Sequence, residues 1–598
     1  MSKMIESILA NKLSKAMQDL YQQELGYESF QIQKTRPEIE GDLTLVVFPL
    51  LRFSRKGPEL TAQEIGDYLL KESREVESYN VIKGFLNLVI SNNYWLSFYA
   101  NTQQDASFGF QAEKDEAPVV IEYSSPNTNK PLHLGHIRNN LLGWSVARIL
   151  KANGKKVAKV NLVNDRGIHI CKSMLAWQKW GDGKTPQNTG LKGDKLVGNF
   201  YVRFDKEYKK EVAQLLDKGM STDEAAQKAP LLLEAKVMLQ KWEAGDPEIR
   251  QLWEKMNAWV YAGFDKTYQR LGIDFDKIYY ESDTYLLGKT LVEEGLGKGV
   301  LFKKEDGSVW CDLTDEGLDE KLLLRGDGTS VYMTQDLGTA QLRFNDYAPQ
   351  SLMYVVGNEQ IYHFDVLSRI LKKLGRNWAE NIFHLSYGMV ELPNGKMKSR
   401  EGTVVDADEL MQEMAETARK TSEALGKFDD FTAEESAELY EMIGLGALKY
   451  FILKVDPKKT ILFNPEESID FTGNTGPFIQ YTHARIRSVL RKAETEGLLI
   501  DKAGLADFVL HKKEKSLLKV LHDYPQIVRL AGDTFSPAQI ANYSFEVAKE
   551  YNQFYHELSI LKEEEDKKKL FRLGLSELTA SILRSAMGLL GIELPERM

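Results

Sequence analysis

A strand, a loop, a helix and a second strand follow one another between residues 119 and 163, and this order constrains the fold more than any other feature of the chain. The run VVIEY (119–123) is short, β-branched and followed by turn residues, which predicts a buried β-strand. Apolar residues then recur at helical spacing from Ile137 to Leu150, and VAKVNLV (157–163) predicts a second strand. Together they predict a parallel βαβ unit, which is half of a nucleotide-binding sheet.

A second half-sheet is expected later in the chain. The run SLMYVVG (351–357) predicts another buried strand, and the apolar spacing in HFDVLSRILKKLG predicts a helix after it. Residues from about 205 to 270 are charged and helical in pattern, which indicates an insertion between the two halves. Near the start, VIKGFLNLVI (81–90) predicts a strand of a separate small domain, and from about 456 onward helical periodicity predicts a bundle.

The composition excludes several classes of protein. With 43% hydrophobic and 27% charged residues, as in ordinary globular chains, the sequence does not predict disorder. Cys171 and Cys311 lie far apart without a C-x-x-C spacing, which argues against a disulfide framework or a cysteine-based zinc site. The sequence shows no signal-peptide core and no apolar run near ~18 residues, so we expect a cytoplasmic protein without a membrane span. The net charge of -10 argues against a whole-surface grip on nucleic acid but allows a local basic face.

Two histidines stand at the start of the predicted helix, in SSPNTNKPLHLGHIRNN (124–140). His133 and His136 should lie on one face of its first turn, where free backbone N–H groups and the helix dipole attract anions such as phosphate. Gly135 between them would let a ligand approach the backbone closely. The unit has neither a P-loop nor a G-x-G-x-x-G motif. From spacing alone, the two residues could equally be helix-capping or surface histidines.

A second candidate for phosphate binding is the loop LPNGKMKSREG (392–402). It opens with an Asn-Gly turn and places Lys396, Lys398 and Arg400 at alternate positions, which point the same way in an extended chain. Three cations on one side of a loop suit a triphosphate. A solvated basic hairpin would show the same pattern.

Together, the two elements resemble the paired H-x-G-H and K-M-S-K-S signatures of class I aminoacyl-tRNA synthetases. Longer segments are similar to the arginyl-tRNA synthetase family: VIEYSSPNTNKPLHLGHIRN to its first signature, VYMTQD to its Y-x-x-x-D segment, and GNTGPFIQYTHARIRS to the opening of its anticodon-binding bundle. GDLTLVV near residue 41 and GFLN near residue 84 resemble its extra N-terminal domain. The resemblance covers most of the chain and is weakest in the insertion.

Three residues predict a pocket for a guanidinium group. Tyr332 and Asp336 are four apart, so on a helix they share a face, and Glu122 lies at the carboxyl end of the first strand, where open α/β sheets bind ligands. Carboxylates there could hold a guanidinium through bidentate hydrogen bonds and would reject neutral amino acids, which leave buried carboxylates unpaired. On spacing alone, Glu122 could be a plain strand-end residue and Asp336 a residue of the helix surface.

The resemblance implies further site residues. His363 would lie where the second half-sheet meets the nucleotide or the amino acid. The implied arginine site consists of Glu122, Ser124, Asn127, Tyr332, Asp336 and Gln360. The implied ATP site consists of His133, Gly135, His136, Gly357, Gln360, Lys396, Met397 and Lys398, of which His133, His136, Lys396 and Lys398 are catalytic.

The resemblance also implies the reaction, which is ATP-dependent attachment of L-arginine to the 3′ end of its tRNA through an enzyme-bound arginyl-adenylate, with release of AMP and pyrophosphate. ATP is then a substrate, and Mg²⁺ is expected to accompany it with no protein ligands assigned. The expected partners are L-arginine, ATP and the tRNA for arginine, and the chain is expected to act as a monomer without a membrane.

Contacts with tRNA are expected mainly in the last domain. Within THARIRSVLRK, Arg485, Arg487 and Arg491 lie on one helical segment, and Phe478 and Tyr481 stand just upstream, so phosphate contacts and base stacking are both available. Phe478 could instead belong to the core.

The expected fold class is α/β multidomain, and at ~100–200 residues per domain a chain of 598 residues holds several domains. It combines a Rossmann-like parallel-sheet catalytic domain that carries a helical insertion, a small α+β N-terminal domain and a C-terminal all-α bundle. The expected boundaries are 1–112 for an N-terminal tRNA-contacting domain, 117–385 for the catalytic domain with its insertion at about 166–284, 386–455 for the signature loop and connecting region, and 456–598 for the anticodon-binding domain.

Two departures from the family pattern leave roles open. In KMKSR a lysine stands third and a serine fourth, so either Lys396 or Lys398 could act on the pyrophosphate. In NDRGIH, Arg166 stands where the family more often has tryptophan, which leaves any role for Asp165 and Arg166 undecided. Two rival hypotheses are a noncatalytic tRNA-binding paralogue and another nucleotidylyltransferase with an H-x-G-H signature.

Overall fold

A five-stranded parallel sheet lies at the centre of the protein, in the order β12-β11-β5-β6-β7. The structure is a computed structural model, and it describes residues 5–103, 105–391, 405–424, 431–498 and 509–598. The chain builds the sheet from β5 through β6 on one side and through β11 on the other, so its order reverses between β5 and β11. Open α/β sheets bind ligands at the carboxyl ends of strands at such a point. The strands are β5 (Val119–Glu122), β6 (Val157–Val163), β7 (Lys277–Tyr280), β11 (Ser351–Gly357) and β12 (Ile382–Tyr387).

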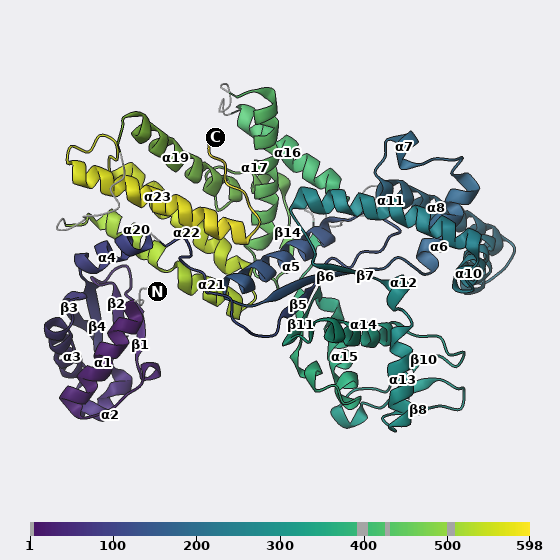
Figure 1. Ribbon diagram of the computed structural model, residues 1–598, viewed down its shortest axis with the longest axis horizontal. Helices are drawn as coiled ribbons and strands as arrows, with labels where there is room; N and C mark the ends of the chain where they lie inside the picture. The colour runs from purple at the N-terminus through teal and green to yellow at the C-terminus, as the bar shows by residue number, and fades with distance from the viewer. Residues whose placement is uncertain (1–4, 104, 392–404, 425–430, 499–508) are drawn as a thin grey trace.

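Helices cover both faces of this sheet, which explains why its strands are mostly apolar. Within β5, Ile121 belongs to the core shared with α5 (Leu134–Ala152), and Val120 belongs to a second core under α14 (Tyr332–Tyr347) and α15 (Ile361–Lys373). Figure 1 shows α5 on one side of the sheet and α14 and α15 on the other. The predicted parallel-sheet fold is confirmed: β6 and β11 have the predicted bounds, and β5 ends one residue earlier than predicted.

Helices fill most of the connection between β6 and β7. The insertion expected at about 166–284 is helical from α6 to α11, but its last part contains β7, which pairs with β6 and buries Tyr279. The helices are α6 (Ile168–Trp180), α7 (Pro186–Thr189), α8 (Gly193–Asp217), α9 (Thr222–Lys228), α10 (Pro230–Glu243) and α11 (Pro247–Leu271). After β7 come α12 (Glu281–Thr284), α13 (Leu287–Gly297) and a small antiparallel sheet of β8 (Leu301–Lys303), β9 (Val309–Cys311) and β10 (Lys321–Leu324).

The N-terminal unit packs helices on an antiparallel sheet of order β1-β2-β4-β3. The single strand predicted over 81–90 was wrong, because the chain reverses at Lys83 and Gly84, whose φ angles of 51° and 77° make a tight hairpin turn. The elements are α1 (Ile5–Tyr21), β1 (Gln31–Lys34), β2 (Leu43–Val46), α2 (Leu51–Ser54), α3 (Pro58–Glu72), β3 (Val76–Ile82), β4 (Phe85–Ile90) and α4 (Asn92–Thr102).

The C-terminal part is a helical bundle, as predicted, and it packs directly on α5. The Ser145 hydroxyl donates to the Leu589 carbonyl (2.9 Å), and Trp144 lies so close to Gly591 that a Cβ there would come within 2.8 Å of the ring. The described elements are β13 (Val390–Glu391), α16 (Ala407–Ala424), α17 (Ala433–Leu453), β14 (Ile461–Leu462), α18 (Pro465–Ser468), α19 (Gly476–Thr495), α20 (Lys512–His522), α21 (Tyr524–Asp533), α22 (Pro537–Glu557) and α23 (Asp566–Leu589). Among the described helices, none combines the length and apolar character that crossing a membrane requires.

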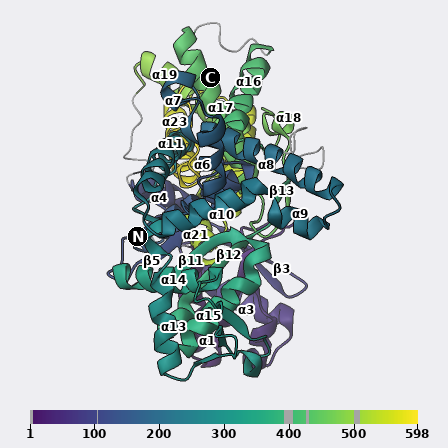
Figure 2. The same ribbon diagram turned by 90° about the vertical axis from the view of Figure 1, so that its right-hand side faces the viewer.

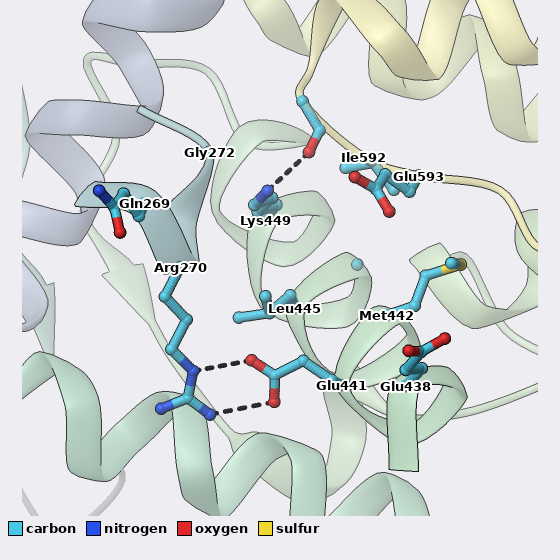
Figure 3. A pocket seen from close by; sticks show the side chains of 12 residues that line it. Gln269, Arg270, Gly272, Glu438, Glu441, Met442, Leu445, Lys449, Ile592 and Glu593 are labelled. Atoms are coloured by element: carbon cyan, nitrogen blue, oxygen red, sulfur yellow. Dashed lines mark hydrogen bonds and ion pairs between the residues drawn. The ribbon is translucent and has the colours of Figure 1, made fainter. Parts of the chain in front are cut away.

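A cavity of about 330 Å³ lies where α11, α17 and the segment after α23 meet (Figure 3). Arg270 faces Glu441 and donates two hydrogen bonds to it (2.7 and 3.0 Å). Lys449 is 7% exposed and donates to the Gly591 carbonyl (2.6 Å). Burial lowers the pKa of Lys449 to about 8, although Glu593 and Glu441 oppose the shift. The protein therefore holds an ammonium group at neutral pH in a place that disfavours its charge.

The stability of the protein relative to a Lys449→Met variant should rise with pH. The pKa of Lys449 is about 8 in the folded protein and ordinarily 10.5, so between these values the unfolded chain binds the proton more readily. The buried charge of Lys449 destabilises the folded protein fully below about pH 8, and this destabilisation decreases as the pH rises. The parent should therefore gain up to about 3 kcal/mol over the variant between pH 7 and 10.5. Melting temperatures across this range would measure the gain, with the exposed Lys458→Met as control; a difference that does not change with pH would contradict it.

Candidate active site

The two predicted histidines cap α5 at the carboxyl edge of the central sheet. His133 is the N-cap residue, and its Nδ1 accepts a hydrogen bond from the N–H of Gly135 (3.2 Å). Nδ1 of His136 accepts from the N–H of His133 (3.2 Å), and the two ring centroids are 3.9 Å apart. A Cβ at position 135 would lie 3.0 Å from the His133 ring, so only glycine fits without a shift. Both histidines thus cap the helix and also lie together on its first turn.

Both imidazoles are neutral at neutral pH. Burial lowers the pKa of His133 to about 4, and the charge of Lys130 adds to this effect. Burial also lowers the pKa of His136 well below its ordinary value, with smaller contributions from His133 and Lys130. Because Nδ1 accepts a hydrogen bond in each ring, the neutral tautomer carries its proton on Nε2. Neither Nε2 has a partner within the part of the chain that the structure describes. The site therefore offers two N–H donors at a helix N-terminus, which suits a phosphate oxygen.

The predicted signature lysines, Lys396 and Lys398, and Met397 between them lie outside the described residues. The described segment before these residues pairs with β14, and the described segment after them contacts the start of α5. Val390 and Glu391 pair with β14. On the other side, the N–H of Leu134 donates to the Val405 carbonyl (3.2 Å), and Asp406 forms a β-bridge with His133. The chain therefore re-enters the described structure directly beside the capping histidines.

Tyr332 and Asp336 share the first turns of α14, as their spacing predicts. Asp336 Oδ2 lies 2.6 Å from Nε2 of His363, which α15 supplies, and the Tyr332 and His363 ring centroids are 5.5 Å apart. Tyr332 is 62% exposed, so its face is open to a ligand. The pKa of the Tyr332 hydroxyl is raised, first by the charge of Asp336, then by burial, and then by the charges of Glu122 and Glu281. Several carboxylates thus act on one point, which is the electrostatic setting that a guanidinium needs.

Glu122 already has a guanidinium partner within the chain. Its Oε2 pairs with Arg343 Nη2, and its Oε1 accepts from the Ser125 hydroxyl (3.0 Å). Arg343 is 1% exposed and lies between the rings of Tyr279 and Tyr354, 5.4 and 5.5 Å from their centroids. Burial raises the pKa of Glu122, and the charge of Arg343 opposes that shift. A strand-end carboxylate is thus present as predicted, but it forms a buried internal ion pair.

The other predicted arginine and ATP residues occupy the loops at the same edge of the sheet. The Ser124 hydroxyl lies 2.6 Å from the Tyr268 hydroxyl and its N–H donates to Asn139, so its polar groups have internal partners. Asn127 is exposed. Gly357 ends β11, and Gln360 is the exposed N-cap residue of α15.

The predicted tRNA-binding arginines lie on α19 with internal partners. Arg485 donates to Asn552 and lies over the rings of Tyr481 and Tyr555, 4.9 and 5.3 Å from their centroids. Arg487 donates to the Glu596 carboxylate (2.5 Å), and Arg491 to the Glu596 carbonyl (2.7 Å). Phe478 packs on Phe545, with ring centroids 5.4 Å apart.

Sequence reasoning missed two charged residues of this region. Arg343 lies seven positions after Asp336, on the same helix face, and this spacing is visible in the sequence. Glu281 directly follows β7 at the carboxyl edge of the sheet, and burial raises its pKa to about 7. Asp165 and Arg166, whose roles the sequence left open, make structural contacts: Asp165 accepts from Ser282 and Tyr261, and Arg166 pairs with Glu243.

Within the described ranges, no three His, Cys, Asp or Glu side chains are placed to hold a metal ion.

Comparisons with known proteins agree across nearly the whole chain. Residues 101–464 match the family described as tRNA synthetases class I (R), catalytic domain, and residues 479–598 match the DALR anticodon binding domain. The protein named Arginine–tRNA ligase from Bacteroides fragilis is 61% identical over 595 residues, which cover 99% of this chain and 100% of the relative. The protein of the same name from Flavobacterium psychrophilum is 55% identical over 607 residues, with the same coverage.

Solved structures share the fold. The arginyl-tRNA synthetase of Thermus thermophilus superposes with a TM-score of 0.77 at 24% identity, and the match covers 100% of both chains. The arginyl-tRNA synthetase from Plasmodium falciparum gives a TM-score of 0.73 at 18% identity, covering 99% of both. With more than half of its length matched by the catalytic family and 99% of it aligned to relatives at up to 61% identity, the chain belongs to the arginyl-tRNA synthetase family of class I aminoacyl-tRNA synthetases.

Proposed function

We propose that this chain attaches L-arginine to the 3′ end of its tRNA in an ATP-dependent reaction through an enzyme-bound arginyl-adenylate. The observation that carries the proposal is the carboxyl edge of the sheet, where two neutral histidines cap α5 with Nε2 donors that have no partner among the described residues, and where a group of carboxylates acts on the Tyr332 hydroxyl. The first part suits a phosphate and the second a guanidinium. The full-length relatives named Arginine–tRNA ligase support the same reaction.

In the first step, a carboxylate oxygen of arginine attacks the α-phosphorus of ATP, and the bond to the bridging oxygen of pyrophosphate breaks. In the second, the 2′-hydroxyl of the terminal adenosine attacks the arginyl carbonyl, and AMP leaves. The protein supplies no covalent nucleophile; it positions the reactants and stabilises charge on the phosphates. His133 and His136 donate from Nε2 to the α-phosphate, and Gly135, Gly357 and Gln360 line the ATP site.

Lys396 and Lys398 would hold the leaving pyrophosphate and Met397 would belong to the ATP site, assignments that rest on the sequence resemblance. Mg²⁺ carried in with ATP would help to neutralise the phosphates.

Arginine is selected by Asp336, Tyr332, Asn127, Ser124, Gln360 and Glu122 in this proposal. Asp336 is the carboxylate best placed to meet the substrate guanidinium, because Glu122 is already paired with Arg343. The substrate would then share Asp336 with His363 or replace that contact.

The KM for arginine should therefore rise about 10- to 150-fold in an Asp336→Asn variant, since a hydrogen bond to a charged group is lost. The asparagine keeps the size of the side chain, so folding should be little affected. Steady-state charging assays would measure the change. Asp365→Asn, which removes an exposed aspartate from α15, is the matched control and should leave KM unchanged. An equal KM in the Asp336 variant and the parent would remove Asp336 from the arginine site.

The tRNA would contact the bundle through Arg485, Arg487 and Arg491, with Tyr481 beside Arg485 as a stacking surface. The N-terminal unit, residues 1–112, is proposed to contact the tRNA as well, on the basis of the family resemblance. We also propose that the protein is cytoplasmic and monomeric. The location rests on the family and on the lack of a cysteine framework in the sequence, and the monomeric state rests on the family.

The proposal is tested by charging total tRNA with each of the twenty amino acids in separate reactions that contain ATP and Mg²⁺. Charging with arginine alone is expected. Charging with another amino acid would keep the synthetase reaction and discard the arginine pocket. If none is charged while a control synthetase charges the same tRNA, a noncatalytic tRNA binder or a different nucleotidyl transfer becomes the better hypothesis.

A further inference from the structure

The segment after α23, residues 592–598, crosses α19, and its backbone holds it there. Gln480 Nε2 donates to the Glu593 carbonyl (2.9 Å), His483 Nδ1 donates to the Pro595 carbonyl (2.9 Å), and Arg491 donates to the Glu596 carbonyl (2.7 Å). Figures 1 and 2 both place the C-terminal end beside α19. Because all three contacts use backbone oxygens, they remain available when the Glu596 side chain is replaced.

The Glu596 carboxylate bridges arginines of two helices. Its Oε2 accepts from Arg487 Nε on α19 and its Oε1 from Arg584 Nη2 on α23, each at 2.5 Å. The side chains of Glu596, Arg487 and Arg584 are 53%, 30% and 54% exposed, so the network lies at the surface. Exposed ion pairs contribute little to stability, and a competing anion can replace them.

Carboxylates and phosphates bind the guanidinium fork in the same way. A phosphate of the RNA backbone could therefore take the place of the Glu596 carboxylate on Arg487 and Arg584. Such contacts add affinity whatever the RNA sequence, so two uncovered arginines would strengthen the binding of every tRNA. A carboxylate that covers them weakens this general attraction and leaves base contacts to decide which tRNA is held.

We propose that Glu596 is a specificity-determining residue: its carboxylate occupies a phosphate position on Arg487 and Arg584 and thereby restrains sequence-independent RNA binding by α19 and α23. The inference rests on the proposed function, because it takes this surface to be the tRNA-binding surface. RNA binds by displacing the carboxylate, which costs free energy. The cognate tRNA offsets this cost with base contacts, and a noncognate tRNA does not.

The test compares Glu596→Gln with Glu593→Gln in the full chain. Both changes remove one negative charge from the same segment, but no arginine contact of the Glu593 side chain is present among the described residues, and glutamine at 596 leaves the backbone anchors in place. Dissociation constants would be measured for the tRNA for arginine and for one noncognate tRNA at several salt concentrations, together with arginine charging by the same preparations.

Glu596→Gln is expected to bind the noncognate tRNA about 3- to 30-fold more tightly than the parent, with a steeper salt dependence and a smaller gain for the cognate tRNA. Adding Arg487→Gln should remove most of the gain. Identical behaviour of the two single variants would overturn the proposal, as would weaker binding of both tRNAs, which would mean that Glu596 only orients the arginines. Absence of arginine charging by the parent would instead reject the proposed function.

Discussion

A His136→Ala variant is expected to form arginyl-adenylate about 100- to 1,000-fold more slowly than the parent, with less than about a threefold change in the KM for arginine. The variant loses an N–H donor aimed at the phosphate, and this donor matters most when charge builds up on the α-phosphate. ATP–pyrophosphate exchange in the presence of arginine and tRNA measures the step; including tRNA ensures that a requirement for it does not conceal activity.

Loss of the His136 imidazole also removes the acceptor of the His133 N–H, so a control must separate catalysis from folding. His556→Ala removes an exposed histidine from the last turn of α22 and should leave the exchange rate unchanged. Melting temperatures of both variants should stay near that of the parent. If His136→Ala exchanges as fast as the parent, the histidine has no role in activation.

An Arg343→Met variant is expected to be destabilised by about 3–5 kcal/mol, because it leaves the buried Glu122 carboxylate without its partner. The methionine fills a similar volume, so the main loss is electrostatic. The melting temperature of the catalytic part of the chain should fall by roughly 4–6 °C. Calorimetry would resolve this transition. The KM for arginine should also rise, because Glu122 no longer has a fixed charge and orientation.

The double variant Glu122→Gln/Arg343→Met provides the matched comparison. With both charges removed, much of the lost stability should return, since replacing a whole buried ion pair is far less damaging than breaking it. A double variant that melts at or below the single one would show that the Arg343 side chain acts through packing between Tyr279 and Tyr354 instead.

Three strands of the central sheet, β5, β6 and β11, could be predicted from the sequence because burial on both faces makes them mostly apolar, as in 157–163 and 351–357. Strands β7 and β12 were not predicted from the sequence. The small sheet of β8, β9 and β10 could not be predicted in this way. Its strands of three or four residues are short, and β10 contains a register shift between Leu322 and Leu324, so neither length nor alternation marks them.

In the candidate site, too, some features could be predicted from the sequence and others could not. The positions of His133 and His136, and of Tyr332 and Asp336, follow from helical spacing and could be predicted. The Glu122–Arg343 and Asp336–His363 pairs join different elements, and only the packing of α14 and α15 on the sheet brings their members together. The neutral state of the histidines also depends on burial, which spacing does not reveal.

The rigid helix α5 joins two distant regions of the protein. Its N-terminus carries His133 and His136, and its C-terminal half is bonded to the end of α23 through Ser145 and Leu589. At 1.5 Å per residue, its 19 residues form a rod about 28 Å long, so a tilt of about 2° at the bundle end displaces the histidines by about 1 Å. A misplacement of about 1 Å can change a reaction rate about a hundredfold. We therefore expect the rate of the chemical step to depend on how the last turn of α23 packs against α5.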